Sequence, residues 1–291
     1  MRYIISLLLT SLALPAWAQV PQVVTDIPPV QALTAQVMGT LGTPVLLLEK
    51  GADEHDFALR PSQMRDIATA DLVVWVGPEL TPWLDRALAA NPAPALALLD
   101  DPATQTQTYA PGHAEEEGSG IDPHAWLNPQ NAIAWLDLIA ARLAALDPEH
   151  ATTYAANSAA AKARVAAMDT EIAAALAPLT DKSFVTFHAA YGYFTARYQL
   201  QAAASLALGD ASAPGAARMS ELAAQLRAGH YSCAFPEMQH DPALLTQIMA
   251  GSDTKLGAAL DPVGSSLDFG PDAYDALMRG LAKNLSDCLY P

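Results

Sequence analysis

Apolar residues occur along the chain in two alternating patterns. Short aliphatic runs occupy residues 22–25, 44–48, 72–76 and 95–99. Each run is followed by a segment with Pro, Asp or Ser near its start, in which apolar residues recur about every 3.6 positions. Strands that alternate with helices in this way are typical of βαβ units around a parallel sheet. The first part of the chain is therefore predicted to form an α/β lobe.

The same alternation restarts in the second half, with predicted strands at residues 184–187, 200–205, 231–235 and 255–260 and predicted helices at 242–250 and 271–289. Between the halves, residues 147–177 open with Asp147, Pro148 and Glu149, which is typical of a helix start. This Ala-rich stretch predicts one helix of about 30 residues, roughly 45 Å long. Such a helix can pack along both lobes as a stiff connection that limits their relative motion. A simple amphipathic helix inside one lobe is the alternative.

We therefore predict an N-terminal α/β lobe at residues 19–146, a rigid linker helix at 147–178 and a C-terminal α/β lobe at 179–291. The first 18 residues have the pattern of a signal peptide, with Arg2, an apolar run at 4–14 and the small-residue cleavage pattern of Ala16 and Ala18. Cleavage before Gln19 predicts an exported, soluble chain, and an uncleaved membrane anchor is the alternative. No Cys follows the cleavage position, which disfavours a lipoprotein.

Charge and cysteine content narrow the functional classes. The 291 residues contain 15 Lys and Arg against 31 Asp and Glu, a net charge of −16. This balance argues against a nucleic-acid partner and is compatible with a cationic one. In an oxidising compartment the two cysteines, Cys233 and Cys288, suggest a disulfide that contributes roughly 3–4 kcal/mol. A shared metal site is the competing interpretation.

Three of the seven histidines lie where strands or loops of an α/β sheet place ligand-binding residues. His55 follows the run at 44–48, His124 directly precedes a predicted helix, and His188 follows the run at 184–187. Asp261 follows the last predicted strand in the same way. Residues just past the carboxyl ends of strands can converge from distant parts of the sequence. The other histidines, in a polar loop, a first helical turn and two polar turns, are interpreted as solvated: His113, His150, His230 and His240.

Three neutral imidazoles and one carboxylate form a four-coordinate set that suits Zn²⁺. A site richer in carboxylates would favour Mn²⁺ or Mg²⁺. The spacing of these residues alone does not decide whether they form a site.

Longer motifs do distinguish a family. They are GADEHDFALRPSQM at 51–64, ADLVVWVGPEL at 70–80, DPHAWLNP at 122–129, TFHAAYGYF at 186–194, CAFPEMQ at 233–239 and LDPVG at 260–264. With these motifs the chain resembles, from about residue 23 to its end, the periplasmic metal-binding proteins of ABC importers for zinc and manganese. It is most similar to the zinc-specific, ZnuA type.

The resemblance implies a periplasmic carrier that captures Zn²⁺ between two lobes and delivers it, as a monomer, to a membrane permease. It implies ligands at His55, His124 and His188, with Asp261 as the preferred fourth ligand and Glu54 or a water as alternatives. It also pairs Cys233 with Cys288. His at position 188 favours zinc, because manganese and iron relatives often have Glu there.

The chain departs from the family pattern at two places. Many zinc members have a His-rich insertion where the loop at 100–120 offers only His113 and three glutamates, so this loop is either a cation-collecting arm or a solvated loop. Ala189 stands where relatives often have Asp, so the sequence does not identify the group that orients His188.

Other functions stay open at this point. They are a manganese or iron carrier, a zinc hydrolase with Glu54 or Glu237 as its base, and an adhesin. The chain has no H-E-x-x-H motif and no lipid-anchor Cys, which disfavours the last two. Replacing His188 with Ala separates them, because a carrier would lose zinc affinity whereas an adhesin would keep its partner.

Overall fold

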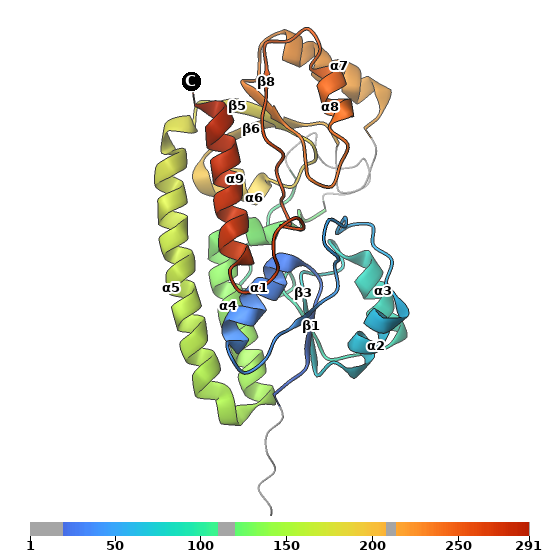
Figure 1. Cartoon of the computed structure of the whole chain (residues 1–291), viewed down its shortest axis with the longest axis vertical. Coiled ribbons are helices and arrows are strands. Elements are labelled where there is room, and N and C mark those ends of the chain that lie inside the picture. The colour runs from blue at the N-terminus through green and yellow to red at the C-terminus, as the bar shows by residue number, and fades with distance from the viewer. Residues whose placement is uncertain (1–19, 110–119, 208–213, 291) are drawn as a thin grey trace, which may run out of the picture.

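The computed structural model describes residues 20–109, 120–207 and 214–290. These residues form two α/β lobes, stacked along the long axis of the molecule, and one long helix that runs beside both (Figure 1). The predicted fold class is confirmed. The lobe boundaries predicted from the sequence stay predictions. The predicted signal peptide at 1–18 lies outside the described residues.

The N-terminal lobe contains a parallel sheet with the strand order β2-β1-β3-β4. The four α-helices described in this lobe, outside residues 110–119, all begin with proline at the first helical position, where the missing N–H costs no hydrogen bond. The strands are β1 (Val23–Thr25), β2 (Val45–Leu46), β3 (Leu72–Trp75) and β4 (Ala95–Ala97). The helices are α1 (Pro28–Met38), α2 (Pro61–Thr69), α3 (Pro82–Ala90) and α4 (Pro129–Leu146), with the 3₁₀ turn η1 (Ala125–Leu127) before α4.

The C-terminal lobe repeats this plan, with the order β6-β5-β7-β8. Its strands are β5 (Ser183–Thr186), β6 (Gln201–Ser205), β7 (Cys233–Phe235) and β8 (Lys255–Leu256). Its helices are α6 (Gly192–Tyr198), α7 (Ala216–Arg227), α8 (Ala243–Ile248) and α9 (Ala273–Leu289). Strand β8 is shorter than predicted. The chain leaves the ladder after Gly257 and pairs again only at Leu260, opposite Glu237.

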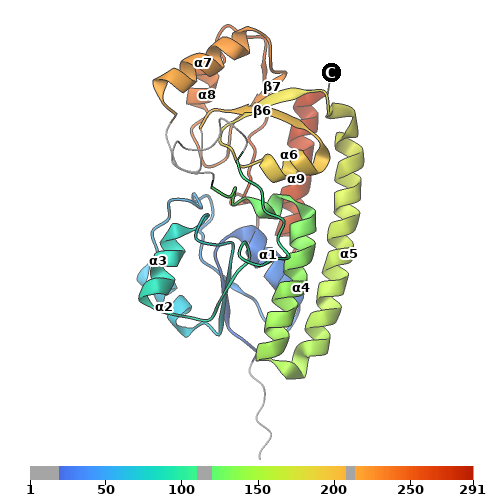
Figure 2. The same cartoon turned by 180° about the vertical axis from the view of Figure 1, so that it is seen from behind.

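The long connecting helix is α5 (Ala151–Leu176), with the 3₁₀ turns η2 (Pro148–His150) before it and η3 (Ala177–Leu179) after it. It begins later than predicted because the Asp147 carboxylate binds His150 Nδ1 (2.7 Å) and the Tyr154 hydroxyl (2.8 Å), which stabilises the tighter turn. One buried stripe of α5 packs against α1 and α4 of the first lobe and against α6 and α9 of the second (Figures 1 and 2). The stripe recurs every three or four residues: Tyr154, Ser158, Ala161, Val165, Met168, Asp169, Ile172 and Leu176.

In the part of the chain that the structure describes, one large apolar core extends through both lobes, and a smaller cluster lies between each sheet and its outer helices. Buried hydrogen bonds also join the lobes. Trp126 Nε1 donates to the Pro262 carbonyl (2.8 Å), the Tyr274 hydroxyl donates to the Trp126 carbonyl (2.8 Å), and the Tyr193 hydroxyl donates to the Asp122 carbonyl (2.9 Å). The segment at 122–127, which carries His124, is therefore fixed by groups of the other lobe.

A disulfide joins Cys233 in β7 to Cys288 in α9, with the two Cα atoms 6.3 Å apart. The predicted pairing is confirmed. It ties the last helix to a central strand of the second sheet. Among the helices within residues 20–109, 120–207 and 214–290, none combines the length and the apolar character that crossing a bilayer requires.

Candidate metal site

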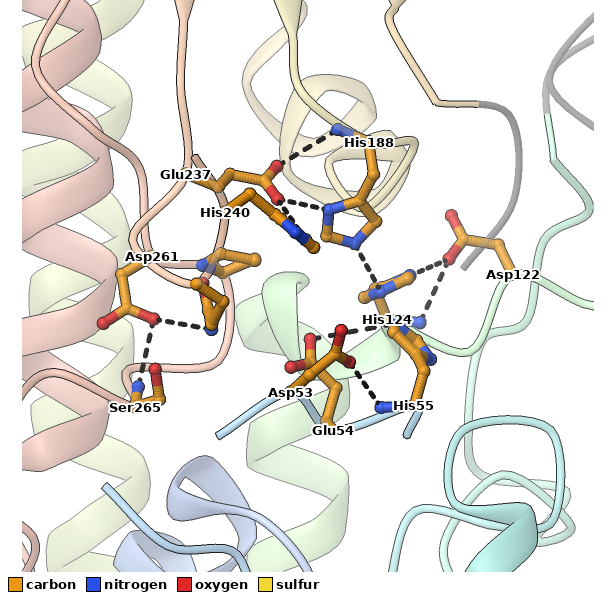
Figure 3. A network of polar contacts seen from close by, with 12 residues as sticks. Asp53, Glu54, His55, Asp122, His124, His188, Glu237, His240, Asp261 and Ser265 are labelled. Carbon is orange, nitrogen blue, oxygen red and sulfur yellow. Dashed lines mark hydrogen bonds and ion pairs between the residues drawn. The ribbon is translucent and has the colours of Figure 1, made fainter. Parts of the chain in front are cut away.

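Three histidines from three separate loops lie close to one another (Figure 3). His55 lies in the loop after β2, His124 directly precedes η1, and His188 follows β5. Their ring centroids are 5.4 Å (His55–His124), 5.8 Å (His55–His188) and 5.3 Å (His124–His188) apart. The sequence-based expectation that these residues converge at the carboxyl ends of the strands agrees with this placement.

The imidazole of His124 is oriented by a neighbour in its own loop. The Asp122 carboxylate accepts hydrogen bonds from His124 Nδ1 (2.8 Å) and from the His124 backbone N–H (3.0 Å) through the same oxygen. The other oxygen of Asp122 accepts from the Gln107 amide (3.1 Å). Since an ionised carboxylate only accepts hydrogen bonds, the proton of the neutral His124 ring is on Nδ1 and the lone pair is on Nε2.

The imidazole of His188 is oriented by Glu237, which follows β7. One Glu237 oxygen accepts from His188 Nδ1 (2.5 Å), and the other accepts from the His188 backbone N–H (3.3 Å) and from the Tyr191 hydroxyl (3.0 Å). Burial tends to raise the pKa of Glu237, but these contacts hold it below its usual value. Glu237 is therefore the orienting group that the sequence could not identify. From the sequence alone, the only role predicted for Glu237 is that of a base in a zinc hydrolase.

The two orienting carboxylates aim the Nε2 atoms of His124 and His188 at the same region. These atoms lie 3.4 Å apart. Two ligand atoms of a tetrahedral zinc site, each about 2.1 Å from the ion, are separated by about 3.4 Å. Both rings are buried, and a cation placed between these two atoms would be within coordinating distance of both.

Glu54 completes the cluster beside His55. Within the described residues, ligand atoms of Glu54, His55, His124 and His188 all lie within 4.8 Å of one another, and the Glu54 carboxylate is 3.7 Å from His55 Nε2. Burial raises the pKa of Glu54 from 4.5 to about 7. Burial also lowers the pKa of His55 well below 6.5, and the rings of His124 and His188 lower it further. His55 is thus held in its neutral form, which is the form that binds metals.

Asp261 lies on a turn near the histidines but outside this group of four. Its carboxylate accepts hydrogen bonds from the backbone N–H of Ser265 (3.0 Å) and Ser266 (2.8 Å) and from the Ser266 hydroxyl (2.6 Å). Gln239 is at the limit of hydrogen-bond distance, 3.5 Å from the same carboxylate. The prediction that Asp261 is a ligand therefore stays a prediction.

The histidines interpreted as solvated have different surroundings. His150 binds the Asp147 carboxylate, and His230 lies in a turn after α7. His240 stacks on Phe187, with ring centroids 4.2 Å apart, and its Nε2 is 3.8 Å from the Glu237 carboxylate. His113 and the neighbouring glutamates of the 100–120 loop lie outside the described residues.

A protein-family model, described as zinc-uptake complex component A, periplasmic, matches residues 23–288. The high-affinity zinc uptake system protein ZnuA of Paracoccus denitrificans (strain Pd 1222) is 46% identical over 307 aligned residues, which cover 95% of this chain and 94% of that one. The protein of the same name from Brucella abortus (strain 2308) is 33% identical and covers 92% of this chain and 91% of its own.

Solved structures of lower sequence identity share the fold. A zinc-bound 138–173 deletion mutant of ZnuA is 24% identical, with a TM-score of 0.78 and coverage of 93% of this chain and 99% of that one. The Pseudomonas aeruginosa protein FpvC in complex with Mn²⁺ is 22% identical, with a TM-score of 0.82 and coverage of 93% and 98%. At this level of identity the two structures support the fold and carry no conclusion about the metal.

Proposed function

Because the chain belongs to the ZnuA family of periplasmic zinc-uptake components, we propose that His55, His124 and His188 bind the Zn²⁺ ion that such a component carries. The family predicted from the sequence motifs is confirmed by the match over residues 23–288 and by the relatives from Paracoccus and Brucella. The protein is the periplasmic, zinc-binding component of a high-affinity zinc uptake system.

The observation that carries the proposal is the pair of oriented imidazoles. His124 and His188 each direct Nδ1 to a carboxylate and Nε2 to a common point, at a separation that fits two ligands of one zinc ion. Three neutral imidazoles also favour zinc over manganese, which prefers a site with more oxygen ligands.

For the fourth ligand we favour Glu54 over Asp261. Glu54 is already grouped with the histidines, whereas Asp261 would have to give up its hydrogen bonds to Ser265 and Ser266. A carboxylate that is raised to a pKa of about 7 by burial also gains most from binding a cation. Asp261 stays the prediction that was made from the sequence, and water stays the other alternative.

We propose a carrier rather than an enzyme. With three histidines and a carboxylate bound, a tetrahedral zinc ion has no open position for a reacting water, whereas a catalytic zinc site keeps one. The ion is captured in the periplasm, where the chain arrives after removal of its signal peptide. It is passed, by a monomer, to the permease of an ABC importer, and no bond is broken. The net charge of −16 raises the local concentration of cations.

The test is a chelator-competition titration of the metal-free mature protein with Zn²⁺ and, separately, with Mn²⁺. We expect one zinc ion, bound far more tightly than manganese. His124→Ala should weaken zinc binding by more than about 100-fold, since even the groups that only orient ligands contribute about 10–100-fold. A preference for manganese, or zinc affinity unchanged in His124→Ala, would contradict the proposal.

The same titration identifies the fourth ligand. Glu54→Ala should weaken zinc binding and Asp261→Ala should not. The opposite result would restore the prediction made from the sequence. If both variants bind zinc as tightly as the wild-type protein does, the fourth ligand is water.

A further inference from the structure

A second group of possible ligands lies on the far side of His188 from the three-histidine site. Ligand atoms of His188, Glu237 and His240 are all within 4.8 Å of one another. Glu237 is shared between the two imidazoles, at 2.5 Å from His188 Nδ1 and 3.8 Å from His240 Nε2. Figure 3 shows the carboxylate of Glu237 beside both rings. Two imidazoles around one buried carboxylate have the composition of a divalent-cation site.

The distances in this group are close to those of a metal site. Ligand atoms of a tetrahedral zinc ion are about 3.4 Å apart, so the His240–Glu237 distance needs to shorten by only a few tenths of an ångström. The His188–Glu237 distance would have to lengthen by about 1 Å, which an ion placed between these atoms would bring about. His240 is held in position by the parallel stack of its ring on Phe187, with an interplanar angle of 12°.

The three side chains differ in their exposure to solvent. The Glu237 and His188 side chains are 1% and 7% exposed, whereas the His240 side chain is 33% exposed. His240 is thus the member that an ion from solvent can reach first. His188 is the member that also belongs to the three-histidine site, so the two sites meet at this ring.

We propose that His240, Glu237 and His188 form an outer Zn²⁺ position, which binds the ion on its way into or out of the three-histidine site. The proposal rests on the proposed function, since it needs the inner site as the destination of the ion. The two positions are occupied in alternation. A neutral imidazole has one lone pair, so His188 serves the inner site through Nε2 or the outer position through Nδ1, and not both.

The proton of His188 accounts for this alternation. With the outer position empty, Nδ1 carries the proton and donates a hydrogen bond to Glu237, and Nε2 carries the lone pair. When an ion binds at the outer position, Nδ1 releases its proton to solvent and coordinates the ion, and Nε2 takes up a proton from solvent. Transfer of the ion to the inner site reverses both exchanges: Nε2 releases its proton and coordinates the ion, and Nδ1 takes up a proton and donates to Glu237 again. The proton count of the ring is unchanged throughout.

The decisive experiment removes the inner site and then the outer one. We expect the variant His55→Ala/His124→Ala to bind one Zn²⁺ weakly and to lose about ten-fold of that residual affinity when His240→Phe is added. Phe is the matched replacement because it keeps a ring stacked on Phe187 and removes the ligand nitrogen. Residual affinity that is unchanged by His240→Phe would overturn the outer position.

The rate of zinc uptake tests the proposal without the double variant, in case that variant is poorly folded. In the protein with all ligands intact, His240→Phe should slow zinc uptake from a chelator by about ten-fold while the equilibrium affinity changes less than about two-fold. Where the double variant does fold, long-range ¹H–¹⁵N spectra should show His188 coordinating through Nε2 in the intact protein and through Nδ1 in the double variant. An unchanged uptake rate, or Nε2 coordination in both proteins, would overturn the proposal. If instead the assignment of the three-histidine site is wrong, the double variant should bind zinc as tightly as the wild-type protein does.

Discussion

The two lobes orient their ligand histidines by the same chemistry but over very different distances along the chain. In the N-terminal lobe, Asp122 orients His124 from two positions away. In the C-terminal lobe, Glu237 orients His188 from 49 positions away, across the neighbouring strands β5 and β7. Each carboxylate accepts from the Nδ1 of its histidine and leaves Nε2 for the ion. The support of His124, by which we mean the carboxylate that orients it, is thus part of a local motif. The support of His188 forms only when the sheet is folded.

The two lobes also differ in covalent cross-linking, because the disulfide lies in the C-terminal lobe. The disulfide joins β7, the strand that positions Glu237, to α9. The N-terminal lobe has no cysteine in its predicted range of 19–146. Its His124 segment is held instead by the hydrogen bonds of Trp126 with Pro262 and Tyr274. The non-local support is thus the one stabilised by a cross-link.

Replacing both cysteines by serine should have the largest energetic effect. The disulfide closes a sequence separation of 55 residues, and its removal should lower the free energy of unfolding by about 3–4 kcal/mol. Chemical denaturation of the metal-free variant and wild type measures this difference. If the reinforcement serves the non-local support, zinc affinity should fall as well. A loss below about 1 kcal/mol would show that α9 is held by packing alone.

Replacing Glu237 by Ala should have the next largest effect, because the His188 ring, the His188 backbone and the Tyr191 hydroxyl all lose their acceptor. We expect zinc affinity to fall by about 100-fold, the upper end of the range for orienting groups. Chelator competition measures it, and Glu237→Gln should recover part of the loss. Glu221→Gln, a change of an exposed side chain in the same lobe, is the matched control. An effect of Glu237→Ala no larger than the control would refute the orienting role.

The two orienting carboxylates show which parts of the fold and of the site can be predicted from the sequence. The alternation of short aliphatic runs and helical segments predicted both sheets, because local hydrophobic periodicity reflects which face is buried. His55, His124 and His188 became candidates because each follows a strand or precedes a helix, and the resemblance to the family predicted them as ligands. Glu237 could not be recognised as the partner of His188, since their contact depends on the pairing of β5 with β7.

The same limit explains the interpretations of Asp261 and His240. Asp261 does follow β8, but the turn at 261–266 supplies N–H groups that bind its carboxylate, and nothing in the order of residues shows this. His240 sits in a polar turn, as the sequence suggested. Its contact residues Phe187 and Glu237 follow β5 and β7, so these contacts appear only when the sheet is formed.

Replacing Asp122 by Asn should have a smaller effect than the loss of Glu237. The His124 segment keeps the interlobe hydrogen bonds of Trp126, and Asn still offers one oxygen to His124 Nδ1. We expect zinc affinity to fall by about ten-fold, or about 1.4 kcal/mol. The same competition assay measures it, beside Asp137→Asn as an exposed control on α4. A loss larger than that of Glu237→Ala would reverse the comparison and place the stronger dependence in the local motif.

The smallest effect concerns pH and Glu54. Burial raises the pKa of Glu54 to about 7, so its carboxyl is protonated below that pH and an arriving zinc ion must displace the proton. Zinc affinity should therefore rise with pH through 7, and lowering the pH from 7 to 6 should reduce it by about five-fold through this group. His55 adds little over this range, because its pKa lies well below 6.5 and the ring is already neutral.

Calorimetry in buffers of different ionisation enthalpy counts the protons released on binding. In Glu54→Gln the count at pH 6.5 should fall by more than half a proton, and an unchanged count would remove Glu54 from the site.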